Sequence, residues 1–384
     1  MKATKGIIVI LIVMFTVIQA CTTAKSQYEK GNYYDAVMRS VEKLRKSPNN
    51  KSARETLANA YPQAINSFMD RLENEDQANV DFKFTKAVYT YEKLNKMYES
   101  IQRSPGAKQV ITNPKKYYTT LNRIKPDAAE EQYGAGLYHL SLGDRNNAKK
   151  AYDYFVRADQ FMPGYKDVGP KIDEAYNRSI LHVVADLKPV QSRTYELSAD
   201  IFYKQVENTL QQIENNEFIR FYTPEEASKY GLQNPDQILK VNFEDFVVGE
   251  THTRQKIEKM EKDSVVVGEV TLDSGRKKEV IGTVNADVSL YRMEVISRGL
   301  VNLSITQNGM DQRDLIYQDF PGEFVWFHEW GQFNGDERAL TEEQSLICSN
   351  RRINPAPPQQ LFVEFTKPIQ QQMHNRLISF YKNY

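Results

Sequence analysis

The chain has 384 residues, of which 26% are charged, and its 50 basic and 50 acidic side chains leave no formal net charge. This balance argues against a nucleic-acid partner, because proteins that bind nucleic acids present a clustered positive field to the phosphate backbone. The length is sufficient for two separate hydrophobic cores without covalent cross-links.

The N-terminal residues carry the pattern of an export signal. Two lysines precede an uninterrupted apolar run from Gly6 to Val17, which is too short for a stable membrane span. The run ends in Ile18-Gln19-Ala20-Cys21, which resembles the lipobox of bacterial lipoproteins. The resemblance implies that residues 1–20 are a cleaved signal peptide and that Cys21 carries acyl chains such as palmitate, which tether the mature chain to a lipid bilayer. A plain N-terminal anchor, or a secretory signal cut elsewhere, is the alternative.

The residues after Cys21 bear on the face of the membrane that the protein occupies. In lipoproteins of the Bacteroidota, acidic residues directly after the lipidated cysteine mark surface display. Here the segment from Thr22 to Ser26 contains no acid, and the first one is Glu29. We therefore expect a Bacteroidota-like outer-membrane lipoprotein that faces the periplasm.

The two halves of the mature chain differ in charge. Residues 22–179 carry 26 basic and 20 acidic side chains, a net charge of +6, whereas residues 180–384 carry 22 and 30, a net charge of −8. This difference predicts two modules. The charges are either solvated surface, or they attract the two halves to each other or to partners of opposite charge.

The first half is expected to be helical and repetitive. Two stretches resemble the tetratricopeptide repeat, in which glycine permits a tight inter-helix turn, alanine lets two helices approach and proline ends the second helix. The first match comprises Tyr28, Gly31, Tyr33, Ala36 and Pro48, and the second comprises Tyr138, Gly143, Ala151, Phe155, Ala158 and Pro163. The resemblance implies a tetratricopeptide-like α-solenoid over residues 21–179, with a concave surface that binds peptides or other proteins.

Two longer helices are predicted between the repeat-like stretches, over residues 52–72 and 80–102. Apolar and aromatic residues recur in both at helical spacing. Tyr33, Tyr61 and Tyr91 are candidates for a binding surface, because a tyrosine ring supplies contact area together with a hydroxyl group. The same rings serve equally well as half-buried helix contacts, and the pattern does not separate the two interpretations.

Strands and helices alternate after residue 180. A β-prone run begins at Ile180, a helix is predicted over Leu197–Ile213, and a short strand covers Phe218–Tyr222. A brief helix near Pro224 leads to a strand over Asp236–Phe246. This order resembles the α/β module of the peptidoglycan-synthase activators and of the curli secretion lipoprotein, which implies a sheet with helices packed on one face.

The chain from Gly249 onward is predicted to form an antiparallel β meander. Strands are expected on both sides of a turn at Asp273-Ser274-Gly275, on both sides of Ser297-Arg298-Gly299, and on both sides of Pro321-Gly322. A closing helix is predicted over Leu361–Tyr381, with Pro368 near its start. The expected fold class is therefore α+β, with residues 180–384 forming an α/β domain that has a C-terminal helix.

An aromatic cluster follows the predicted turn at Pro321. Strand alternation places Phe324, Trp326, His328 and Trp330 on one face. Phe324, Trp326 and Trp330 are candidates for a platform that binds a peptide or a sugar ring, and the alternative is a packed face of the sheet.

No catalytic motif is recognised, and we do not expect an enzyme. Glu323, Glu329, Asp336 and Glu337 lie beside the aromatic cluster and allow a glycan-active protein as an alternative, because paired carboxylates cleave glycosidic bonds. The five histidines lack metal-ligand spacing, so neither a metal nor a cofactor is predicted. Cys348 is expected to be a small buried hydrophobic residue.

Together these patterns predict a lipid-anchored adaptor or assembly factor of the cell envelope, with an envelope protein as its partner. A regulator of peptidoglycan synthesis or a subunit of a secretion complex is the sharper alternative, and it rests on the α/β resemblance. A protein that binds or acts on glycan, with peptidoglycan as the partner, is the third.

Overall fold

The computed structural model describes residues 23–384 except 79, 189, 191, 193, 274, 310 and 311, so the expected signal peptide and Cys21 lie outside the described residues. The chain divides between Ser179 and Ile180 into two compact units, which we call the helical unit and the sheet unit. Helices dominate the first, and a mixed sheet with helices forms the second. The predicted α+β class is confirmed at this level.

The helical unit consists of paired helices. Its elements are α2 (Ala24–Glu29), α3 (Tyr33–Lys46), α4 (Lys51–Gln77), α5 (Lys83–Gln102), α6 (Pro105–Lys108), α7 (Tyr118–Ser141), α8 (Arg145–Phe161) and α9 (Val168–Ser179). Helix α3 packs on α4, α7 packs on α5 and α8, and α8 packs on α9. Gly31 and Gly143 adopt positive φ angles of 77° and 82° in the connections before α3 and α8, a conformation that favours glycine.

Small residues allow these helices to approach closely. A Cβ atom on Gly136 of α7 would come within 2.6 Å of the Phe155 ring on α8, and Ala151 is fully buried between the same helices. The predicted stripe on α4 is also buried, including Leu57, Ala60 and Ile65. Helical periodicity in the sequence therefore located the core of this unit.

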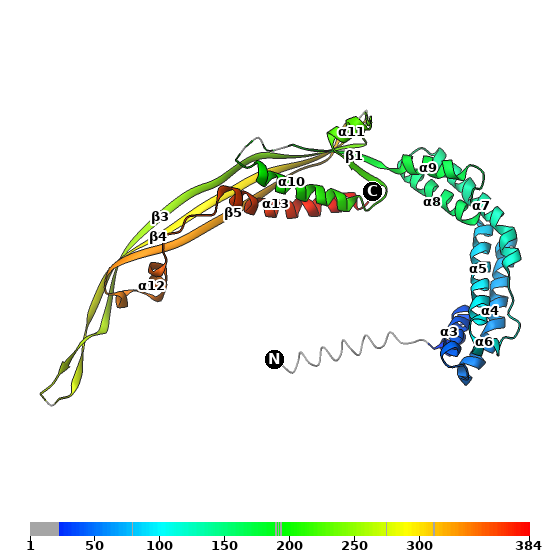
Figure 1. The fold of residues 1–384 in the computed structure, drawn as a ribbon, viewed down its shortest axis with the longest axis horizontal. Helices are drawn as coiled ribbons and strands as arrows, with labels where there is room; N and C mark the ends of the chain where they lie inside the picture. Colours follow the sequence, from blue (N-terminus) through cyan, green and yellow to red (C-terminus); the bar gives the residue numbers. More distant parts are fainter. Residues whose placement is uncertain are drawn as a thin grey trace. The chain divides into compact units, whose positions relative to one another are not determined.

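The sheet unit is built on five strands in the order β2-β1-β3-β4-β5. The strands are β1 (Leu181–Leu187), β2 (Ile219–Tyr222), β3 (Gln237–Thr271), β4 (Lys277–Gln307) and β5 (Arg313–Gly335), and the helices are α10 (Glu196–Ile213), α11 (Pro224–Lys229), η1 (Glu337–Ala339), α12 (Glu342–Ser349) and α13 (Pro358–Tyr381). Strands β2, β1 and β3 are parallel, whereas β3, β4 and β5 are antiparallel. Figure 1 shows α10 and α13 side by side along the long strands.

Two of the predicted turns are wrong, because the strands continue through them. Ser297-Arg298-Gly299 lies inside β4, and Pro321-Gly322 lies inside β5. Gly299 and Gly322 are instead directly opposite each other in the β4–β5 ladder. A Cβ on Gly299 would come within 2.6 Å of the Phe365 ring, and one on Gly322 would collide with the Phe365 carbonyl oxygen of α13. These glycines permit close approach of a helix to the sheet and do not mark turns.

Helix α13 also begins earlier than predicted. It starts at Pro358, so Pro368 is inside the helix and not near its start. Four residues of its predicted stripe, Phe365, Ile369, Met373 and Leu377, are buried together with Phe202 of α10 in the main core of the sheet unit, and the fifth, Phe380, is half-buried against that core. The two helices therefore cover the same face of the sheet. The sides of α10 and α13 that do not contact the sheet are available for other contacts.

The far part of the β3–β4 hairpin is a two-stranded ribbon. Strand β5 pairs with β4 only as far as Gly335, opposite Ala286, and β3 and β4 continue beyond this pair without a third described strand. Bulges interrupt the ribbon between Lys262 and Val265 and between Val266 and Gly268. Several apolar side chains are exposed there: Val266, Val267, Val270, Val280 and Ile281. A two-stranded ribbon is only marginally stable in water by itself. Burial of these exposed apolar side chains against another molecule would stabilise it.

The glycine pair yields a stability prediction. Gly322→Ala should destabilise the sheet unit by about 2 to 3 kcal/mol, because the new methyl group overpacks the contact with the α13 backbone and forces a shift. The matched control is Gly268→Ala, which adds the same methyl group inside β3 where no atom lies within 4 Å. Urea unfolding followed by circular dichroism measures both. Equal midpoints for the two variants would contradict the close packing.

Candidate functional site

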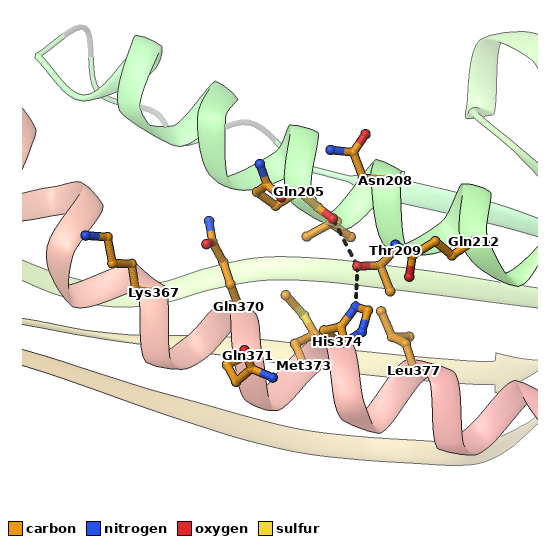
Figure 2. Close-up of a pocket in the computed structure, with 11 residues that line it drawn as sticks. Gln205, Asn208, Thr209, Gln212, Lys367, Gln370, Gln371, Met373, His374 and Leu377 are labelled. Carbon is orange, nitrogen blue, oxygen red and sulfur yellow. Dashed lines mark hydrogen bonds between the residues drawn. The ribbon is translucent and has the colours of Figure 1, made fainter.

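A groove between α10 and α13 is a candidate site (Figure 2). Its cavity volume is about 430 Å³. It is lined by Gln205, Val206, Asn208, Thr209 and Gln212 of α10 and by Lys367, Gln370, Gln371, Met373, His374 and Leu377 of α13. Five of these side chains are carboxamides, and we call the site the carboxamide groove.

Helix geometry explains why the amides gather there. Each helix turns its apolar stripe toward the sheet, with Val206 and Leu210 buried on α10 and Met373 buried on α13. Gln205, Asn208 and Gln212 of α10 are spaced i, i+3 and i+7, so they follow one line along the flank of the helix. In Figure 2, Gln370 of α13 extends toward α10, and Gln205 and Gln212 lie on α10 on either side of Thr209.

A hydrogen bond between Thr209 and His374 closes the bottom of the groove. The Thr209 hydroxyl donates to the carbonyl oxygen of Gln205 at 3.0 Å, and Thr209 Oγ1 lies 3.0 Å from His374 Nδ1.

The carboxamide groove is polar but almost uncharged. Lys367 forms a 2.6 Å ion pair with Glu364, and no carboxylate lines the groove. Among the described residues, none of the five carboxamides makes a side-chain hydrogen bond with another part of the chain, so their donors and acceptors are available. Beside these amides, the Thr209 hydroxyl and the His374 imidazole are the other neutral polar groups of the lining.

The amide spacing matches an extended main chain. Gln205 and Gln212 are seven residues apart on a helix, which corresponds to roughly 10 Å. This distance equals about three residues of extended polypeptide. A carboxamide offers one acceptor and two donor hydrogens, so it satisfies both the N–H and the C=O groups of a main chain without reading its sequence.

The predicted aromatic platform lies on the helix-covered face of the sheet. Trp326, His328 and Trp330 stack in a row along β5, with ring centroids 6.1 and 5.9 Å apart, so the predicted alternation is confirmed. Phe324 packs into the core beside Trp326. The connector between α12 and α13 is fastened to this row, because His328 Nε2–H donates to the Arg351 carbonyl oxygen at 2.7 Å. All four side chains are half-buried.

The three predicted tyrosines do not form one surface. Tyr61 is 9% exposed, and its hydroxyl accepts a 2.7 Å hydrogen bond from the Lys115 backbone N–H. Tyr91 is half-buried with its ring against Tyr117. Tyr33 lines a cavity of about 520 Å³ beside α4.

The structure does not bring the four candidate carboxylates together. Glu323 and Glu329 are six residues apart on β5, or roughly 20 Å, whereas glycosidase carboxylates lie within about 10 Å of each other. Hydrogen bonds from Arg338 lower the pKa of Asp336 to about 2, which suits an ionised partner of arginine and not a general acid. Glu337 accepts a hydrogen bond from Ser345.

Histidine, cysteine and carboxylate side chains form no metal-binding group of three or more within the described part of the chain. Cys348 is half-buried, packs with Leu290 and Leu340, and covers Gly331. Burial raises the pKa of its thiol. Cys348 thus packs among apolar residues, but it is half-buried and not fully buried as predicted.

Sequence reasoning missed the carboxamide groove. The run Gln370-Gln371-Gln372 and the recurrence of amides at 205, 208 and 212 were visible. Polar residues on the flank of an amphipathic helix are ordinarily solvated, however, and no periodicity shows that two such flanks face each other.

Comparisons with family models, with curated proteins and with solved structures find no match to this chain. In the described part of the chain, no helix has both the length and the apolar character needed to cross a membrane.

The buried tyrosine gives a test of its structural role. Tyr61→Phe should destabilise the helical unit by about 1 to 3 kcal/mol, because the Lys115 N–H loses its acceptor in a partly buried place. Tyr89→Phe is the control, since Tyr89 is 46% exposed and its ring, not its hydroxyl, makes its contact with Phe161. Thermal unfolding compares the two. A Tyr61→Phe protein as stable as Tyr89→Phe would leave Tyr61 free for a binding role.

The thiol gives a pH prediction. Because burial raises the pKa of Cys348, its thiolate fraction at neutral pH is smaller than that of a free cysteine. In a chain with Cys21→Ser, iodoacetamide should alkylate Cys348 more slowly than it alkylates a free cysteine peptide near pH 7.5, and the rate should keep rising above pH 9. Mass spectrometry follows the reaction, and the same chain in urea is the control. A rapid reaction in the folded chain at pH 7.5 would indicate an activated thiol.

Proposed function

We propose that this protein is a lipid-anchored adaptor on the periplasmic face of an outer membrane, and that its sheet unit holds an extended segment of an envelope protein in the carboxamide groove. One observation carries the proposal: five carboxamides with unused donors and acceptors line a groove that contains no carboxylate. Such a lining complements the N–H and C=O groups of a polypeptide main chain.

Magnitudes favour weak, sequence-tolerant binding. A hydrogen bond contributes about 1 kcal/mol net, so five of them provide at most roughly 5 kcal/mol, equivalent to a Kd near 0.2 mM. Tighter binding requires side chains of the partner on the apolar floor made by Val206, Met373 and Leu377. An adaptor that holds one segment among several contacts suits these numbers, because linked contacts multiply in affinity.

The open edge of the sheet supports the same proposal. Strand β1 pairs with β3 only from Gln237 to Val241, and the rest of β3 has no strand on its outer side in the described structure. Together with the exposed valines of the ribbon, this edge offers a place where a partner can add a strand.

The helical unit supplies a further contact surface in this proposal. Paired helices, the positive φ of Gly31 and Gly143, and buried Ala36 and Ala151 support a tetratricopeptide-like arrangement. Arrays of that kind bind other proteins on a concave side.

The sharper alternatives remain forms of the same binding role. The parallel β2-β1-β3 arrangement, with α10 between β1 and β2, favours a regulator of peptidoglycan synthesis or a secretion-complex subunit over a glycan-active protein. A glycan platform has less support, because Trp326 and Trp330 are half-buried beside the Arg351 connector.

A photo-crosslinker tests the adaptor role. The crosslinking amino acid p-benzoylphenylalanine at Gln371, inside the groove, should capture one envelope protein in living cells through a contiguous peptide. At Gln372, an exposed neighbour outside the groove, the yield should be much lower. Peptide mapping of the crosslinked product measures both.

A second variant tests the role of the amides. Gln205→Leu with Asn208→Leu, made in the chain that carries the crosslinker, should reduce the yield about tenfold or more, because two hydrogen-bonding groups are lost while the chain stays folded. Equal capture from positions 371 and 372, or an unchanged yield in the leucine variant, would refute the carboxamide groove as the docking site.

A further inference from the structure

The first described helices enclose a second groove, which is rimmed by cations. Its cavity volume is about 910 Å³. It is lined by Thr23, Ala24, Lys25, Met38, Arg39, Glu42, Lys43, Lys46, Asn50, Ser52 and Ala53. We call it the basic groove. Nothing in the proposed adaptor role uses it.

Its charge is distinctly positive. The lining holds four cations, Lys25, Arg39, Lys43 and Lys46, and one carboxylate, Glu42. Glu42 is ionised, because hydrogen bonds from Lys46 and Arg45 lower its pKa, so the lining carries a net charge of +3. Lys43 forms no ion pair with any described residue, so no nearby carboxylate neutralises its charge.

The arrangement of these cations comes from one helix. Arg39, Lys43 and Lys46 follow each other at i, i+4 and i+7 on α3, so they stand in one row on its surface. The opposite side of α3 is the buried side, with Val37 and Leu44 in the core. Met38 and Ala53 provide apolar surface between the charges.

The chain holds this groove close to position 21. Thr23, which lines the groove, is two residues from Cys21, and two residues span at most roughly 7 Å in any conformation. Helix α2 begins immediately afterwards, with the Thr23 hydroxyl accepting a 3.2 Å hydrogen bond from the Ser26 N–H. No long linker separates the helical unit from an acylated Cys21.

This tether is shorter than the range of the electrostatic interaction. The Debye length in physiological salt is about 8 Å, so phosphates at a membrane surface that holds Cys21 would attract those charges of the basic groove that lie nearest Thr23. Juxtamembrane lysines and arginines are attracted to anionic lipid surfaces in the same way.

We propose that the basic groove binds the phosphate headgroup of an anionic phospholipid and thereby holds the helical unit against the bilayer. The proposal rests on the lipid anchor of the proposed function. It adds a specific headgroup contact, which fixes the orientation of the helical unit at the membrane in addition to its attachment. Thr23 is only two residues from Cys21, and the lining is positively charged. Both observations favour a lipid headgroup as the ligand over a distant protein partner.

Vesicle binding without the acyl chains tests this contact. The probe is the full mature chain with Cys21→Ser, mixed with vesicles of phosphatidylcholine that contain phosphatidylglycerol, and with vesicles of phosphatidylcholine alone. Sedimentation measures the bound fraction. We expect binding only to the anionic vesicles, with a decline as salt is raised.

Charge reversal locates the contact. Lys43→Glu with Lys46→Glu changes the groove from +3 to −1 and should reduce the partition onto anionic vesicles at least tenfold. Lys43→Gln with Lys46→Gln should give a smaller loss and guards against misfolding, which circular dichroism checks. The matched control is Lys93→Glu with Lys96→Glu, two exposed lysines at the same spacing on α5, which line no part of the basic groove.

Three outcomes would overturn the proposal: equal binding to neutral vesicles, an equal loss in the Lys93 and Lys96 control, or release by inorganic phosphate at constant ionic strength, which indicates a site for free phosphate. Mass spectrometry of the native protein tests the anchor separately. An unacylated Cys21 would refute the anchor, whereas the vesicle experiment decides whether the headgroup contact exists, so the two failures are distinguishable.

Discussion

The close contact between α13 and the long strands is the constraint on which the sheet unit depends. Gly299 and Gly322 face each other across β4 and β5, and only hydrogen atoms at both positions leave room for Phe365 and the α13 backbone. This contact fixes the distance of α13 from the sheet. Because α10 packs in the same core, the distance between the two helices is fixed as well. The carboxamide groove is a consequence, because the flanks of two helices that are fixed on the same sheet must face each other.

The polar groups of this molecule fall into two kinds. Those that hold the fold together have partners: the Tyr61 hydroxyl accepts from Lys115 N–H, Thr209 joins His374, and Ser297 accepts from Gly249 N–H at a β-bulge. The five carboxamides of the groove have no side-chain hydrogen bond within the described structure, and they lie at the surface, where an unpaired group can bond to water at little cost. A surface with unused hydrogen-bonding groups is what the proposed binding role requires.

The spacing of apolar residues predicted the helices and strands more reliably than glycine and proline predicted the turns. The helices over 52–72 and 197–213 and the short strand before Pro224 lie where the apolar spacing predicted them, within a few residues. Glycine and proline misled at 299 and 321, because a glycine in a strand indicates either a turn or a close neighbour, and only the neighbour tells them apart. Pro321 is tolerated within β5 because that strand lies at the edge of the sheet.

The sequence by itself determined the local properties: the helical and sheet-rich halves, the buried stripes, the aromatic alternation on β5 and the packing role of Cys348. Each of these depends on side chains a few residues apart, which helix and strand geometry place on a common face. The tertiary structure decided what meets across the chain. It half-buried the aromatic row under the connector at Arg351, separated Glu323 from Glu329 and opposed the amides of α10 to those of α13. Such encounters depend on long-range packing, and no spacing within one element encodes which flank a distant helix will face.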